Sequence, residues 1–158
     1  MNITLTVNGE ARSVGAPETT SLLEVLRNHL GLMGTRYGCG LEQCGCCMVL
    51  VDDQTAYACT RELGTVAGRS VTTVEGLGTA AAPHPLQQAF LDEQAGQCGY
   101  CLSGILISAK ALLDRNPDPS RAEIVTALDK HLCRCGAHQR ILRAVERAAA
   151  TLRGGRAT

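Results

Sequence analysis

Nine of the 158 residues are cysteines, and eight of them form two groups whose spacing could bind metal. The first group has the spacing C-x4-C-x2-C-x11-C and consists of Cys39, Cys44, Cys47 and Cys59. This spacing is typical of a plant-type [2Fe-2S] site, in which three thiolates lie on one tight loop and a fourth comes from a following strand or turn. Glycines at positions 38, 40 and 45 allow such a loop to turn its backbone N–H groups towards the sulfur atoms. Zinc is the main alternative, although structural zinc usually takes two short knuckles rather than one crowded loop.

Cys46 is the ninth cysteine, and this spacing does not use it. Using it in place of Cys47 would break the C-x4-C-x2-C pattern, and neighbouring side chains of an extended loop point apart. We interpret Cys46 as a small buried hydrophobic residue, with a backup ligand as the alternative.

The second group joins Cys98-x2-Cys101 to Cys133-x-Cys135. Each pair lies at the start of an expected helix, so the positive ends of two helix dipoles can face one anionic centre. This arrangement favours a second cluster between helix N-termini. Zinc is a stronger alternative here than in the first group. A thioredoxin-like C-x-x-C is disfavoured, because no βαβ pattern surrounds it.

The residues around the first cysteine group are expected to form a small α+β unit that holds these cysteines in place. Strands are expected at residues 3–7, 10–14, 47–53, 54–60 and 70–76. Asn8-Gly9 is a type I′ hairpin signal between the first two strands. A helix is expected to begin at Ser21, which forms a capping box with Glu24, and to stop at Gly31.

The second half of the chain predicts helices. Residues 76–85 contain Gly, Ala and Pro without periodicity, so we place a linker there. Four helices are expected, at residues 85–96, 101–115, 120–132 and 137–153, with Gly154-Gly155 closing the last. Short connections between four helices predict a compact bundle. The expected domains are residues 1–75, the linker 76–85, and residues 86–158.

Charge and composition restrict the class of partner. The 15 basic residues balance the 15 acidic ones without a long run of like charge, so nucleic acid is not an expected partner. No apolar run is long enough to span a bilayer, and the first residues lack a signal-peptide pattern. Dense cysteine in an odd number favours metal or redox chemistry in a reducing compartment. We expect a cytoplasmic protein, leaving open attachment to a membrane or export through a partner.

Other polar residues give no sign of catalysis. The histidines at positions 29, 84, 131 and 138 are interpreted as surface or interface residues. Arg140, Arg143 and Arg147 share a helical face that we interpret as solvated. No nucleophile with its base and no carboxylate pair stands out, so substrate chemistry is expected outside this chain.

The stretches GCGLEQCGCC, ACT, QCGYC and LCRCGAHQRIL occur in this order. In them the sequence resembles the small iron-sulfur subunits of molybdenum hydroxylases, the xanthine dehydrogenase and aldehyde oxidoreductase family. It is most similar to small subunits of bacterial enzymes that hydroxylate N-heteroaromatic rings, such as nicotinate dehydrogenase and isoquinoline oxidoreductase. The resemblance implies a β-grasp ferredoxin-like domain followed by a four-helix domain, each with one [2Fe-2S] cluster.

The resemblance also implies roles for individual residues. The ligands of the solvent-side cluster would be Cys39, Cys44, Cys47 and Cys59. The second site would lie next to the molybdenum cofactor, with the ligands Cys98, Cys101, Cys133 and Cys135. Gln97 and Cys135 would approach the molybdopterin, which we expect as its cytosine dinucleotide in a large partner subunit. Position 46 is commonly a small residue in relatives, so Cys46 departs from the family without removing a ligand.

We therefore interpret the chain as an electron-transfer subunit of a molybdenum-dependent hydroxylase that oxidises an N-heteroaromatic, nicotinate-like substrate or an aldehyde. Electrons would pass singly from the molybdenum site through the helical-domain cluster and then the ferredoxin-like one. The acceptor would be a flavin subunit, a c-type cytochrome or another carrier. Two alternatives are a free-standing ferredoxin-like carrier and a zinc-stabilised interaction module.

Overall fold

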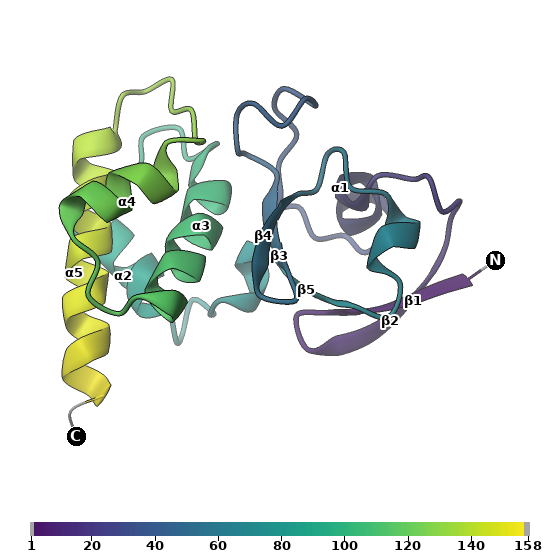
Figure 1. The fold of residues 1–158 in the computed structure, drawn as a ribbon, viewed down its shortest axis with the longest axis horizontal. Helices are drawn as coiled ribbons and strands as arrows, with labels where there is room; N and C mark the ends of the chain where they lie inside the picture. Colours follow the sequence, from purple (N-terminus) through teal and green to yellow (C-terminus); the bar gives the residue numbers. More distant parts are fainter. Residues whose placement is uncertain (1, 157–158) are drawn as a thin grey trace.

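The structure is a computed structural model that describes residues 2–156, with side chains through residue 155. A half built on a β-sheet holds the N-terminus, and a helical half holds the C-terminus (Figure 1). The two halves lie side by side, and the loop between η1 and β3 reaches towards the helices. Among the described residues, no helix is both long enough and apolar enough to cross a membrane.

The first half contains a five-stranded mixed sheet. Its strands are β1 (Asn2–Val7), β2 (Glu10–Gly15), β3 (Met48–Val51), β4 (Gln54–Tyr57) and β5 (Ser70–Thr72). They lie in the order β2-β1-β5-β3-β4; β1 and β5 run parallel, and the other neighbours are antiparallel. Asn8 and Gly9 have φ angles of 51° and 83°, as a type I′ turn requires, so the predicted hairpin is confirmed. The last three strands are shorter than expected.

The helix between β2 and β3 changes type along its length. A single α-helical turn, α1 (Leu22–Glu24), begins where the Ser21 hydroxyl accepts a hydrogen bond from the Glu24 N–H. It continues as a π-helical turn, η1 (Val25–His29), closed by a 3.0 Å bond from the Leu30 N–H to the Val25 carbonyl. Gly31 follows in the left-handed conformation and ends the helix, as predicted. Such π turns are frequent at functional sites.

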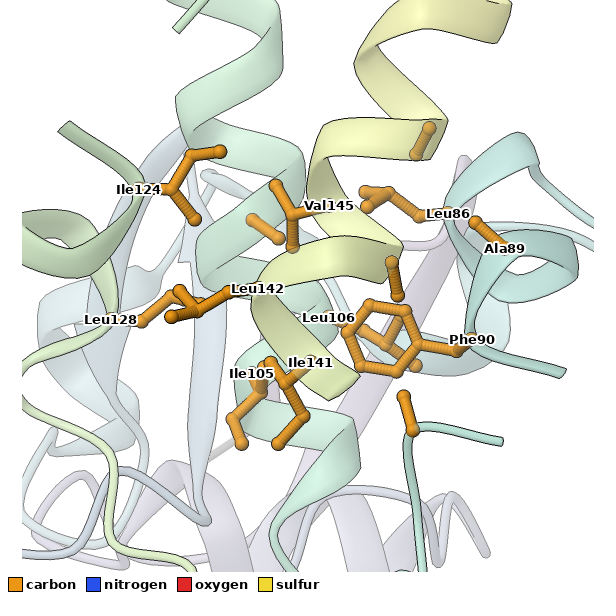
Figure 2. Close-up of a cluster of buried hydrophobic side chains, with 14 of the residues drawn as sticks. Leu86, Ala89, Phe90, Ile105, Leu106, Ile124, Leu128, Ile141, Leu142 and Val145 are labelled. Atoms are coloured by element: carbon orange, nitrogen blue, oxygen red, sulfur yellow. The ribbon is translucent and has the colours of Figure 1, made fainter. Parts of the chain in front are cut away.

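The second half contains four helices, as predicted. They are α2 (Pro85–Asp92), α3 (Leu102–Arg115), α4 (Arg121–Leu128) and α5 (His138–Arg156). Two short 3-10 turns precede them in the chain: η2 (Leu63–Val66) lies between β4 and β5, and η3 (Val74–Gly76) follows β5. Figure 2 shows that all four helices contribute side chains to one core, with Phe90 of α2 next to Leu106 of α3. Aliphatic side chains dominate this core, because the chain has no Trp and a single Phe.

Three predicted helix ends are wrong. The third helix of the bundle, expected at residues 120–132, ends at Leu128. The first helix of the bundle stops at Asp92, because Gln94 takes a φ of 48° that a helix does not accommodate. The last helix does not stop at Gly154-Gly155 but continues to Arg156. Neither glycine takes the left-handed conformation that ends helices. Each costs about 1 kcal/mol relative to alanine inside a helix, which does not by itself break one.

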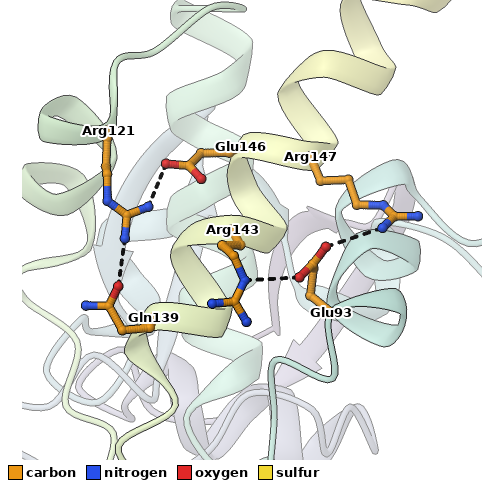
Figure 3. Close-up of polar contacts among 6 residues, drawn as sticks. All are labelled: Glu93, Arg121, Gln139, Arg143, Glu146 and Arg147. Carbon is orange, nitrogen blue, oxygen red and sulfur yellow. Dashed lines mark hydrogen bonds and ion pairs between the residues drawn. The ribbon is translucent and has the colours of Figure 1, made fainter.

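Several polar side chains hold the helical half together. His84, expected as a surface or interface residue, is half-buried and caps α2, where its Nδ1 accepts the Leu86 N–H at 3.1 Å. The face of α5 that carries Arg143 and Arg147 is exposed to solvent, as predicted. Arg143 and Arg147 are about half exposed, but both form ion pairs with Glu93 at 3.3 Å, which joins α5 to α2 (Figure 3).

Candidate metal centres

The loop between η1 and β3 carries three cysteines of the first group, and the fourth, Cys59, follows β4. Backbone N–H groups of this loop point at sulfur atoms. Leu41 and Gln43 donate to Cys39 Sγ at 3.3 and 3.2 Å, and the Cys39 N–H donates to Cys44 Sγ at 3.3 Å. The hydrogen bond from Leu41 is the main reason that the pKa of Cys39 falls to about 7. The loop therefore favours thiolate, the form that binds metal.

Glycines make this close wrapping possible, as predicted. A Cβ on Gly38 would lie 2.5 Å from Cys44 Sγ. A Cβ on Gly45, which has a φ of 74°, would lie 2.2 Å from His131 Nδ1. Side chains at these two positions would fill the space around the sulfur atoms and push the loop away from the helical half.

The sulfur atoms of the first site meet in pairs. The side chain of Cys39 contacts that of Cys44, and the side chain of Cys47 contacts that of Cys59, while Cys46 also contacts Cys44. Cys47 is only 2 % exposed, and burial raises the pKa of its thiol to about 12. Cys47 is thus the buried ligand candidate of this site, whereas Cys39, Cys44 and Cys59 are half-buried.

The second site repeats this arrangement on different elements. Cys101 is the N-cap residue of α3, and Cys133 and Cys135 lie in the loop before α5, as predicted. Cys135 Sγ lies 3.4 Å from Cys98 Sγ, and the Cys101 side chain contacts that of Cys133. The backbone N–H of Tyr100 lowers the pKa of the exposed Cys98, whereas burial raises the pKa of Cys101 to about 12.

Two sulfur pairs per site are the donor set that a [2Fe-2S] cluster needs, because each of its two irons takes two thiolates. A single zinc ion instead needs its ligands to converge on one point. Within residues 2–156, no group of three or more His, Cys, Asp or Glu side chains is arranged to hold a single metal ion. The residues present therefore fit a [2Fe-2S] cluster at each site.

Gln97 and Cys135, which the resemblance links to a pterin, lie together in the structure. The Gln97 side-chain N–H donates to the Cys135 carbonyl at 3.1 Å. Gln97 and the neighbouring Cys98 are both exposed. The second site therefore has an open edge at Gln97 and Cys98.

Cys46 is buried between the two sites. It is 7 % exposed and belongs to the core of the helical half, as its interpretation as a small buried residue predicted. It lines a cleft of about 480 Å³ together with cysteines of both sites: Cys44, Cys98, Cys101 and Cys133. Burial raises the pKa of the Cys46 thiol to about 12, so it remains protonated near neutral pH.

Sequence reasoning missed the residues that join the two sites. Tyr100, inside the C-x2-C motif of the second site, donates its hydroxyl hydrogen to the Tyr37 carbonyl at the start of the first site's loop. The Arg36 guanidinium lies 5.1 Å from the centroid of the Tyr100 ring, a cation-π distance. Both contacts join residues more than sixty positions apart, and the sequence carries no signal for them.

His131 was expected near the second site as a surface or interface residue, but it is only 4 % exposed. Its Nε2 lies 2.7 Å from the Ser108 hydroxyl of α3. Burial lowers the pKa of His131 to about 4, so the ring is neutral near neutral pH. A histidine in a polar stretch gives no sequence signal for such burial.

Comparisons with known proteins agree with these two sites. Residues 5–70 match a family model described as a 2Fe-2S iron-sulfur cluster binding domain, and residues 73–146 match a [2Fe-2S] binding domain. The chain is 56 % identical to one of the nicotinate dehydrogenase subunits of Pseudomonas putida, over 96 % of both chains. It is 51 % identical to the alpha chain of isoquinoline 1-oxidoreductase from Brevundimonas diminuta, over 90 % of this chain and 94 % of the relative.

Solved structures show the same fold. Quinoline 2-oxidoreductase from Pseudomonas putida 86 contains a chain that superposes with a TM-score of 0.93 at 35 % identity, covering 98 % of this chain and 97 % of that one. Aldehyde oxidoreductase from Desulfovibrio desulfuricans gives a TM-score of 0.94 at 44 % identity over 97 % of this chain, which corresponds to 17 % of that longer chain.

These likenesses confirm the predicted fold, a ferredoxin-like α+β half followed by four helices. They do not favour the free-standing carrier or the zinc module, because the relatives are subunits of oxidoreductases and both halves match [2Fe-2S] families. The chain belongs to the family of small iron-sulfur subunits of molybdenum hydroxylases.

Proposed function

We propose that each half of the chain binds one [2Fe-2S] cluster through the two sulfur pairs described above. In the ferredoxin-like half the ligands would be Cys39, Cys44, Cys47 and Cys59. In the helical half they would be Cys98, Cys101, Cys133 and Cys135. The pairing of the sulfur atoms in both sites carries this proposal. The corresponding domains would be residues 1–75 and 86–158, joined by residues 76–85.

The chain serves electron transfer in a molybdenum hydroxylase. Each cluster accepts and releases one electron, which divides a two-electron oxidation into single steps. The residues of this chain hold the sulfur atoms, bury Cys47 and Cys101, and donate backbone hydrogen bonds to sulfur atoms of both sites. Burial and such hydrogen bonds set a cluster's reduction potential, so the two sites can differ in potential.

The open edge of the second site supports its placement next to the catalytic centre of the larger partner subunit that the family implies. We propose that Gln97 and Cys135 contact the molybdopterin there, and that the pterin is the cytosine dinucleotide. The exposed loop of the first site, with Leu41 and Gln43 at its tip, would then face the acceptor. A flavin subunit or a c-type cytochrome as acceptor, and a cytoplasmic location, stay predictions.

The names of the relatives suggest the substrate. Relatives at 56 % and 51 % identity are subunits of nicotinate dehydrogenase and isoquinoline 1-oxidoreductase. We propose that the complex hydroxylates an N-heteroaromatic ring, with an aldehyde as the second candidate, because aldehyde oxidoreductase shares the fold. No residue of this chain is proposed as catalytic.

The test is metal analysis combined with EPR spectroscopy of the native complex reduced with dithionite. We expect two iron pairs per chain, two distinct spin-half signals, and molybdenum co-purifying with a larger subunit. Adding nicotinate in place of dithionite should reduce both clusters if the substrate assignment is right. An anaerobic preparation that contains zinc, or a single iron pair, would contradict the assignment of two sites.

A further inference from the structure

The two sites touch through backbone atoms at one point. The carbonyl of Cys44, in the first site, accepts a hydrogen bond from the N–H of Leu132 at 3.1 Å. Leu132 directly precedes Cys133 of the second site. One hydrogen bond and a short run of backbone therefore link a sulfur-bearing residue of each site.

Two glycines allow this approach. Gly104, in the first turn of α3, faces the backbone of Gly45 so closely that a Cβ on Gly104 would lie 2.0 Å from the Gly45 carbonyl oxygen. The same Cβ would lie 3.3 Å from the Cys46 Cα. Because these are backbone atoms of a tight loop, they cannot move aside as the end of a flexible side chain can. A side chain on Gly104 would therefore push the first site's loop away from α3.

His131 closes the contact from the other side. Its Nδ1 faces Gly45, at the position where a Cβ would lie 2.2 Å away. Its Nε2 is held by the Ser108 hydroxyl at 2.7 Å, one turn along α3 from Gly104. The ring is thus fixed between α3 and the loop, and Leu132 is the next residue in the chain.

We propose that Gly104 and His131 are positioning residues that hold the Cys44 carbonyl on the Leu132 amide and thereby set the electronic coupling between the two cluster sites. The proposal rests on the proposed function, because it requires a cluster at each site. Neither residue carries a sulfur ligand, so each can be changed without removing one.

The test compares two glycine-to-alanine substitutions in α-helices of the intact complex. Gly104→Ala places a methyl group against the Gly45 carbonyl, whereas Gly154→Ala in α5 meets no atom within 4 Å. The first readout is the low-temperature EPR splitting that arises when both clusters are reduced and interact magnetically. The second is the rate of hydrogen exchange at the Leu132 amide, measured by mass spectrometry on peptides that contain it.

We expect Gly104→Ala to retain the iron of both sites, to lose the splitting, and to exchange the Leu132 amide faster than the wild type. Gly154→Ala should match the wild type in all three measurements. If Gly104→Ala fails to assemble, Ser108→Ala decides, because it frees the His131 ring without adding volume. The Ser108→Ala complex should then show a smaller EPR splitting than the wild type and faster hydrogen exchange at the Leu132 amide.

The proposal is overturned if the variant that assembles keeps both the wild-type splitting and the wild-type exchange rate. It is also overturned if the wild type, with both clusters reduced, shows no splitting. A wild-type complex that contains only one cluster would instead contradict the proposed function. The two failures are therefore distinguishable by the iron content and EPR spectrum of the wild type alone.

Discussion

Cys46 and Cys47 are neighbours in sequence, but their side chains are buried in different hydrophobic cores. Cys46 belongs to the core of the four helices, and Cys47 belongs to the core of the sheet and α1. The boundary between the two halves therefore passes through one peptide unit of the first site's loop. This relationship explains why only one of the two thiols can join Cys59, which packs against the sheet core.

The two adjacent cysteines should respond differently to substitution. Cys46→Ala should retain both EPR signals and lose only about 1 kcal/mol of unfolding free energy, as is usual for trimming a buried side chain. Cys47→Ala should lose the signal of the ferredoxin-like site, because its sulfur pairs with that of Cys59. Iron content and EPR of the two variants, purified in parallel, check this. Loss of the first site's signal in Cys46→Ala would mean that the ligand choice is wrong.

Arg27 lies in the π-helical turn and should stabilise the start of the first site's loop. Its guanidinium donates hydrogen bonds to the carbonyls of Met33 and Thr35, both at 2.8 Å. A hydrogen bond to a charged group contributes about 2 kcal/mol to stability. Arg27→Ala should therefore destabilise the ferredoxin-like half by at least roughly this amount and speed the loss of iron to a chelator.

The matched control for that prediction is Arg12→Ala. Arg12 forms an exposed ion pair with Glu10, two residues away, so its removal should change stability by less than about 1 kcal/mol. Chemical unfolding and the rate of bleaching in a chelator measure both variants. Equal effects of the two substitutions would show that the π-helical arginine has no special role in the loop.

The sequence predicted the local features of this fold well. The Asn8-Gly9 hairpin and the Ser120 capping box depend on residues close in the chain, and both occur as expected. Cysteine spacing assigns the sulfur ligands of each cluster, and that assignment stays a prediction. By contrast, the burial of His131 and the contact of Tyr100 with Tyr37 depend on how the halves pack. No local pattern encodes that packing, so these residues could not be predicted.

The helix ends also divide into those that local sequence determines and those that tertiary packing determines. Gly31 ends its helix because it can adopt a positive φ, whereas Gly154 and Gly155 do not. A glycine that follows a helical pattern is compatible with both outcomes, and tertiary contacts decide between them. The α5 helix already has its core and ion-pair contacts before it reaches these residues. The two glycines at the end of α5 therefore do not stop the helix, although their position in the sequence predicted that they would.

Gln97 offers a test of the second site's open edge. Gln97→Ala removes the amide that donates to the Cys135 carbonyl, but it removes no sulfur atom. We expect both EPR signals to remain in the dithionite-reduced complex, while reduction of the clusters by substrate becomes slower. Stopped-flow absorbance measures the rate of cluster reduction, first with substrate and then with dithionite. The comparison separates electron delivery from the substrate site from reduction of the clusters themselves. Gln88→Ala, whose side chain bonds Asp92 within α2, serves as the control and should leave both rates unchanged.

The ion pairs between α2 and α5 should contribute modestly and in a salt-dependent way. Glu93 is 22 % exposed and accepts from both Arg143 and Arg147, which are about half exposed. Pairs this open to solvent are each worth about 0.5 kcal/mol, since water and salt screen them. Glu93→Gln should therefore lower the free energy of unfolding by about 1 kcal/mol at low ionic strength, and by less in high salt.

Urea unfolding of the helical half, followed at both ionic strengths, measures this difference. Arg121 forms the matched comparison, because it pairs with Glu146 across α4 and α5 at 2.7 Å and also bonds the neutral Gln139 (Figure 3). Its hydrogen bond to an uncharged amide is not screened, so Arg121→Ala should retain more of its effect in high salt than Glu93→Gln does. Equal salt dependence of the two variants would mean that charge screening does not govern the packing of α5.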